Sequence, residues 1–145
     1  MSSTNKGELV RTKTSATLIA CALAAGSIMF SAPVASAAAY CDSSGYTATN
    51  EPMSRCTKLS NGYLYAHQSS NDKIATQYSK TGGSSVSVRL GYSRGGSTHY
   101  SSYFSIGSGQ TVSKQFSTGS GSYCQSMTGV LNYSGGTFQT PSTHC

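Results

Sequence analysis

The tyrosines are the residues of this chain with the clearest potential for binding chemistry. A phenol ring has an apolar face and a polar hydroxyl and loses little conformational entropy when it is bound, so exposed tyrosines suit contact with a sugar ring, a peptide or another protein. The alternative is that tyrosine fills a core in which leucine and isoleucine are scarce. We predict a binding face made of five of the ten tyrosines: Tyr63, Tyr65, Tyr92, Tyr100 and Tyr103.

Residue types that could carry out catalysis are sparse. After position 39 the acidic residues are Asp42, Glu51 and Asp72, each in or beside a polar turn or loop, whereas a typical glycosidase needs two carboxylates that face each other. The histidines at 67, 99 and 144 could still meet a serine and an acid in the folded chain, because a Ser-His-acid triad is recognised by geometry. We predict a protein that is not an enzyme and has no cofactor, with a small hydrolase as the last alternative.

The cysteines predict covalent cross-links. Four of them follow position 39, and an even number of cysteines after an export leader is typical of a disulfide framework. The chain has no Cys-x-x-Cys pair, and no carboxylate or free thiol lies near its two Ser-Thr-His tripeptides, so we predict no metal site. Three connectivities are possible, and local closure favours Cys41–Cys56 and Cys124–Cys145.

The first 39 residues have the layout of a secretory signal peptide. Three basic residues lie within the first 13 positions, an uncharged apolar run covers 16–30, and small residues fill 31–39. This order is typical of a cleaved leader, with the cut after Ala37 or Ala39; we take Ala39. The apolar run is shorter than the ~20 residues that span a bilayer, which argues against an anchor. Lipidation at Cys21 is a second alternative. We therefore expect a secreted product of residues 40–145.

The rest of the chain predicts an all-β fold. Val86, Val88, Leu90 and Tyr92 fall two apart, which is the pattern of a strand with one buried face, and residues 84–106 form the clearest hairpin. Eight such stretches, 8–12 residues apart, predict one antiparallel β-sandwich or barrel-like domain of about seven or eight short strands. The eight stretches are 56–60, 63–68, 73–80, 84–92, 98–106, 110–117, 122–133 and 137–140.

The same alternation yields more local expectations. Tyr63 and Tyr65 should share one face of a strand, whereas Tyr100 and Tyr103 should lie on opposite faces. Residues 100, 102, 104 and 106 should share a face. Asn61-Gly62 predicts a type I′ turn, because both of its central residues favour positive φ. Gly129 predicts a β-bulge.

The charge of residues 40–145 is moderately basic. Seven Lys and Arg stand against three Asp and Glu, a net charge of +4 with neutral histidines. The basic residues are scattered, whereas a nucleic-acid site would cluster them, so we expect no nucleic-acid partner. We also expect a monomer without membrane contact after cleavage. The charge serves solubility or a weak attraction to anionic polymers such as cell-wall phosphates.

Four segments carry a resemblance to other proteins. They are Lys-Leu-Ser-Asn-Gly at 58–62, Tyr-Ser-Lys-Thr-Gly-Gly-Ser at 78–84, Gly-Ser-Thr-His at 96–99 and Gly-Thr-Phe-Gln-Thr-Pro at 136–141. Together with the alanine-rich end of the leader, they resemble segments of small secreted proteins of actinomycetes. The resemblance implies secretion and a bacterial source; it implies no activity.

These observations favour a small secreted, non-enzymatic binding or interaction module. Its contact surface would be exposed tyrosines on a basic surface, and its partner a cell-wall polymer, another extracellular glycan or an extracellular protein. The alternative is a secreted protease inhibitor or antimicrobial protein, with a rigid loop at 93–97 or 118–121 as its contact segment.

Reduction of the disulfides should destabilise the fold strongly. Each bridge is expected to contribute about 2–4 kcal/mol, mainly by restricting the unfolded chain, and a core with few aliphatic residues has little stability to spare. Thermal unfolding followed with and without a reductant should show a much lower midpoint in the reduced protein. An unchanged melting curve, with reduction verified by mass, would contradict this expectation.

Overall fold

The computed structural model describes residues 40–145, which form an all-β structure of two antiparallel sheets without helices. This confirms the predicted fold class. The signal peptide at 1–39 and the lipidation alternative at Cys21 lie outside the described residues. The nine strands are β1 (Ser54–Leu59), β2 (Gly62–Ser69), β3 (Lys73–Lys80), β4 (Val86–Arg94), β5 (Ser97–Tyr100), β6 (Phe104–Ile106), β7 (Thr111–Ser117), β8 (Thr128–Tyr133) and β9 (Gly136–Gln139).

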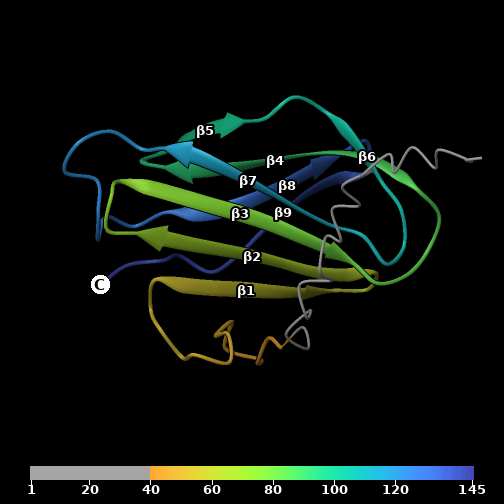
Figure 1. Cartoon of the computed structure of the whole chain (residues 1–145), viewed down its shortest axis with the longest axis horizontal. Helices are drawn as coiled ribbons and strands as arrows, with labels where there is room; N and C mark the ends of the chain where they lie inside the picture. Colours follow the sequence, from red (N-terminus) through yellow and green to blue (C-terminus); the bar gives the residue numbers. More distant parts are fainter. Residues whose placement is uncertain (1–39) are drawn as a thin grey trace, which may run out of the picture. The chain divides into compact units, whose positions relative to one another are not determined.

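The strands divide between the sheets in two simple orders. Sheet A has the order β1-β2-β3-β7, and sheet B has the order β5-β4-β8-β9, with β6 also paired to β4. Figure 1 shows β1, β2 and β3 side by side, with the segment before β1 along its outer edge. The count is nine because the return arm of the 84–106 hairpin is divided into β5 and β6, which pair with the same strand, β4.

The alternating residues of the central strands fill the space between the sheets, as the sequence predicts. On β3 the buried positions are 74, 76, 78 and 80, and on β4 they include 88, 90 and 92. Strand residues that point to one face recur every second position, so each sheet buries one side. One core cluster contains Leu64, Tyr78, Val88, Leu90, Ile106 and Leu131, and the other contains Ala66, Ile74, Tyr92 and Met127.

Gly129 allows the two sheets to approach closely and does not form a bulge. The β4–β8 register is unbroken, with Tyr92 opposite Gly129, so the expected bulge is wrong. A Cβ atom at Gly129 would lie 2.7 Å from Cβ of Ala66 and 3.3 Å from Cγ2 of Thr76, both on sheet A. Glycine is required here because any side chain would push the sheets apart.

The first hairpin turns one residue earlier than Asn61-Gly62 predicts. Leu59 pairs with Gly62, so Ser60 and Asn61 form the corner, and Asn61 does not have a positive φ. The carbonyl of Asn61 accepts a hydrogen bond of 2.8 Å from the Thr81 amide. This contact, which joins the turn to the chain after β3, comes from tertiary structure and overrides the local preference of the dipeptide.

The two predicted disulfides are confirmed, and both hold a terminal segment of the described chain. Cys41 is bonded to Cys56 and Cys124 to Cys145. Arg55 adds a second attachment for the segment before β1: its guanidinium lies 3.9 Å from the ring centroid of Tyr46 and donates to the carbonyls of Ser44 and Gly45 at 2.8 and 3.1 Å.

Replacement of Gly129 by alanine should destabilise the protein by about 1–3 kcal/mol, because the added methyl group overpacks the contact between the sheets. The matched control is Gly107→Ala, since a Cβ at Gly107 would meet its nearest neighbour at an ordinary 3.5 Å. Denaturant unfolding of the two variants measures the difference. Equal stability of the two variants would contradict the role assigned to Gly129.

Candidate functional site

The candidate site lies on the outer face of sheet B and begins with Arg89. This residue alternates with the core residues Val88 and Leu90 on β4, so its side chain lies on the face away from the core. Two positions along, Gly91 pairs with Tyr100 of β5. A Cβ at Gly91 would lie 2.8 Å from Cδ1 of Tyr100, so the bare backbone of Gly91 lets the Tyr100 ring lie across it.

An extra residue between β5 and β6 brings Tyr103 to the same place. The β4–β5 register pairs Gly91 with Tyr100, whereas the β4–β6 register pairs Val88 with Phe104, so three residues, 101–103, face two residues of β4. Because of this extra residue, the residues after it point to the opposite face of the sheet from the one that simple alternation predicts. Tyr103 therefore joins Tyr100 near Arg89, and Phe104 and Ile106 pack against the core instead of sharing a face with Tyr100. The bulge thus makes two expectations wrong: that Tyr100 and Tyr103 lie on opposite faces, and that residues 100, 102, 104 and 106 share a face.

Arg89, Tyr103 and Asn132 form a connected group. The guanidinium carbon of Arg89 lies 4.0 Å from the ring centroid of Tyr100 and 4.9 Å from that of Tyr103. The Oδ1 atom of Asn132 accepts hydrogen bonds of 2.9 Å from Nε of Arg89 and from the Tyr103 hydroxyl. Asn132 itself is oriented by its Nδ2 group, which donates to Oγ1 of Thr137 at 2.9 Å. We call Arg89, Tyr100, Tyr103 and Asn132 the arginine–tyrosine cluster.

This cluster leaves binding groups available to a partner. The two terminal nitrogens of Arg89 donate no hydrogen bond to any residue within 40–145, so up to four N–H donors remain in a planar fork. Tyr103 is 54% exposed and offers a flat apolar surface beside that fork. The arrangement can stack on a ring and donate paired hydrogen bonds to a carboxylate or to neighbouring hydroxyls.

The other tyrosines of the predicted binding face lie elsewhere. Tyr63 and Tyr65 share the outer face of sheet A, as expected, with ring centroids 6.3 Å apart. Burial and then the neighbouring Tyr63 raise the pKa of Tyr65. Tyr92 is only 5% exposed and packs in the core against Phe116 and His99. Its place on a binding face is therefore a wrong prediction; at this position tyrosine fills the core.

The contacts of His67 with a serine and an acid differ from those of a hydrolytic triad. Nδ1 of His67 shares a hydrogen bond of 2.7 Å with Oγ of Ser54, and Oε2 of Glu51 lies 3.5 Å from the same serine oxygen. In a hydrolytic triad the acid contacts the histidine and orients it, whereas here the acid contacts the serine. His99 stacks on Tyr92.

One pattern was missed by the sequence-based prediction. The residues Gly91-Tyr-Ser-Arg-Gly95 have the Gly-x-Ser-x-Gly spacing of a nucleophile elbow. The structure places Ser93 within β4, paired with Thr98 and Thr128 on its two sides. A nucleophile elbow is a sharp turn between a strand and a helix, so this segment has the spacing without the geometry.

Asp72 has a structural role in the described chain. Its carboxylate accepts hydrogen bonds from the amides of Tyr123 (2.8 Å) and Gly121 (3.1 Å) and from the Ser122 hydroxyl (3.2 Å). Its carbonyl accepts from the amide and hydroxyl of Thr118. The Tyr123 amide, more than the other donors, lowers the pKa of Asp72, and burial opposes this shift. Asp72 thus fixes the loop between β7 and β8.

Within residues 40–145, no group of three histidine, cysteine or acidic side chains is arranged to hold a metal ion. The same residues include no helix long and apolar enough to cross a membrane.

The chain matches no protein-family model, no curated protein and no solved structure.

The contribution of Asp72 to the stability of the fold should depend on pH. Because its folded pKa is lowered, the stability that it provides is complete above the unfolded value of about 3.9 and is lost as the pH falls through the folded value. Asp72→Asn should therefore lower the denaturation midpoint clearly at about pH 7 and much less at about pH 2.5. Glu51→Gln is the control, since Glu51 makes one long contact. A pH-independent effect of Asp72→Asn would disagree with a carboxylate that acts through its charge.

Proposed function

We propose that residues 40–145 are a non-enzymatic module that binds an extracellular or cell-wall glycan through the arginine–tyrosine cluster. The observation that carries the proposal is the exposed Tyr103 ring beside the partly unused fork of Arg89. Sugar rings have apolar faces that stack on aromatic side chains, and their vicinal hydroxyls or carboxylates accept paired hydrogen bonds from a guanidinium.

Charge favours an anionic glycan over a neutral one. The described residues have a net charge of +4, which attracts a polyanion over a distance before contact is made. At the cluster, a carboxylate of an acidic sugar would match the planar fork of Arg89 better than a neutral hydroxyl pair, because charge-assisted bidentate hydrogen bonds are the stronger kind. We therefore expect polymers of uronic acids or peptidoglycan to bind more tightly than cellulose.

Secretion is part of the proposal. The two disulfides are consistent with an oxidising, extracellular environment, since such bonds are rare in the cytosol. The signal peptide expected at 1–39 would deliver the chain there. A monomer with one glycan site suits this role.

Binding should depend on Tyr103 and on the geometry of Arg89. Tyr103→Ala should weaken retention on polygalacturonate or peptidoglycan by about tenfold, since the loss of an aromatic stacking surface costs about 1 kcal/mol or more. Arg89→Lys should weaken it as well, because lysine retains the charge but not the fork. Co-sedimentation with the insoluble polymer and calorimetry with soluble oligosaccharides measure both effects.

Two matched variants serve as controls. Tyr123→Ala removes another exposed tyrosine (42% exposed) on the loop held by Asp72, and Arg94→Lys makes the same basic exchange at the β4–β5 turn. Both should bind as the original chain does. If Tyr123→Ala loses binding and Tyr103→Ala does not, the glycan contacts the 118–123 loop and not the arginine–tyrosine cluster. No retention on polygalacturonate, peptidoglycan, chitin or cellulose would remove the glycan proposal.

A further inference from the structure

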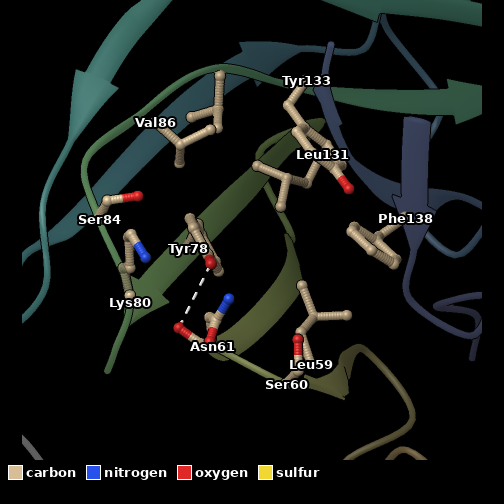
Figure 2. Close-up of a pocket in the computed structure, with 12 residues that line it drawn as sticks. Leu59, Ser60, Asn61, Tyr78, Lys80, Ser84, Val86, Leu131, Tyr133 and Phe138 are labelled. Atoms are coloured by element: carbon tan, nitrogen blue, oxygen red, sulfur yellow. Dashed lines mark hydrogen bonds between the residues drawn. The ribbon is translucent and has the colours of Figure 1, made fainter. Parts of the chain in front are cut away.

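A pocket of about 280 Å³ lies between the two sheets, near the β1–β2 turn and the connection from β3 to β4. Its walls come from both sheets: Leu59 and Tyr78 belong to sheet A, and Val88, Leu131 and Phe138 belong to sheet B. The volume is just below the range of about 300–1,000 Å³ that is usual for ligand sites. Figure 2 shows the Lys80 amine and the Ser84 hydroxyl on one side of the pocket, with Leu131, Tyr133 and Phe138 on the opposite side.

Lys80 is the unusual residue of this pocket. It is the last residue of β3 and follows Ile74, Thr76 and Tyr78 on the inward face, so the alternation of the strand directs a lysine toward the core. It is only 3% exposed. Gly83, which has a positive φ of 73°, lies over the amine, since a Cβ there would be 3.3 Å from Nζ of Lys80.

The ammonium group of Lys80 has few partners in the described chain. Its one hydrogen bond to residues 40–145 goes to the carbonyl of Gly82, whereas an ammonium group has three donors. The three acidic side chains of residues 40–145 form hydrogen bonds away from the pocket: Asp42 with the Tyr46 amide, Glu51 with Ser54 and Asp72 with the 118–123 loop. A buried charge without an opposite charge is costly, so an anion placed beside Nζ would be favoured.

The rest of the pocket suits an apolar, aromatic group. The Tyr133 and Phe138 rings stack with centroids 5.9 Å apart and an interplanar angle of 7°. Tyr78 stands between Lys80 and this pair, and its hydroxyl donates to the Asn61 carbonyl at 3.4 Å. Burial, and then the neighbouring Tyr133, raise the pKa of Tyr78, so its hydroxyl stays neutral and can donate. The pocket thus has one cationic end and one aromatic end.

We propose that this pocket binds a small aromatic monocarboxylate, with the carboxylate at Lys80 and Ser84 and the ring against Tyr133 and Phe138. The site includes neither Arg89 nor Tyr103 and stands independently of the glycan proposal. The pocket volume of about 280 Å³ limits the ligand to a small molecule with a single ring.

The test is a titration of the protein with 3-phenylpropanoate and with its neutral analogue 3-phenylpropanamide, followed by NMR of labelled methyl groups. The acid should shift the methyl signals of Val86, Val88 and Leu131, which line the pocket, and leave Val130 unchanged, since Val130 is buried outside it. The acid should bind at least about tenfold more tightly than the amide, the expected gain from a charge-assisted contact.

Lys80→Met should abolish the preference for the acid, and Lys73→Met should keep it. The second variant is a matched control because it removes the same charge from the other end of the same strand. If Lys80→Met does not fold, as judged by circular dichroism, the comparison of acid and amide in the original chain still decides. Three results would overturn the proposal. They are equal binding of the acid and the amide, the absence of shifts at the pocket methyls up to about 10 mM ligand, and an unchanged preference for the acid in folded Lys80→Met.

Discussion

The close contact of the two sheets at Gly129 is the constraint on which the rest of the structure depends. Ala66 and Thr76 of sheet A leave no room for a side chain at this position, and the Thr76 hydroxyl donates to the carbonyl of Gly91 across the sandwich at 2.8 Å. A short distance between the sheets lets a core with few aliphatic residues be filled, because small side chains and a satisfied hydroxyl meet directly. Larger side chains gather around Tyr78 and Leu131, which line the pocket that contains Lys80.

The shortage of acidic residues explains a second property of the fold. With three carboxylate side chains for seven basic residues, three of the cations of residues 40–145 lie over aromatic rings: Arg55 over Tyr46, Arg89 over Tyr100 and Tyr103, and Lys114 over Phe104. A ring face attracts a cation without the desolvation cost of a second charge. Tyrosine therefore has two structural uses here, as core filler at Tyr92 and as the partner of a cation.

Most of the fold could be predicted from the sequence because its signals are local. The alternation in β3 and β4 identifies the buried residues, and short loop closure identifies both disulfides. The site could be predicted only in part. Tyr100 and Tyr103 were expected as binding residues, but their convergence depends on a bulge that exists only when the return arm is in register with β4. Arg89 and Asn132 are 43 residues apart and meet only because β4 pairs with β8.

Residue type alone does not separate a structural arginine from a binding one; the burial of the side chain and the groups that its guanidinium holds do. Arg55 and Arg89 both lie on tyrosine rings, at 3.9 and 4.0 Å. The guanidinium of Arg55 donates through Nε and Nη2 to two carbonyls of the segment before β1, and the residue is only 7% exposed, so Arg55 mainly holds that segment in place. Arg89 donates a hydrogen bond to residues 40–145 through Nε alone, and its terminal nitrogens remain unused there. Its ring contacts and Asn132 fix its orientation in advance, which reduces the entropy lost when a partner binds. A partner would therefore meet an ordered fork at Arg89, whereas little of the Arg55 side chain is open to contact.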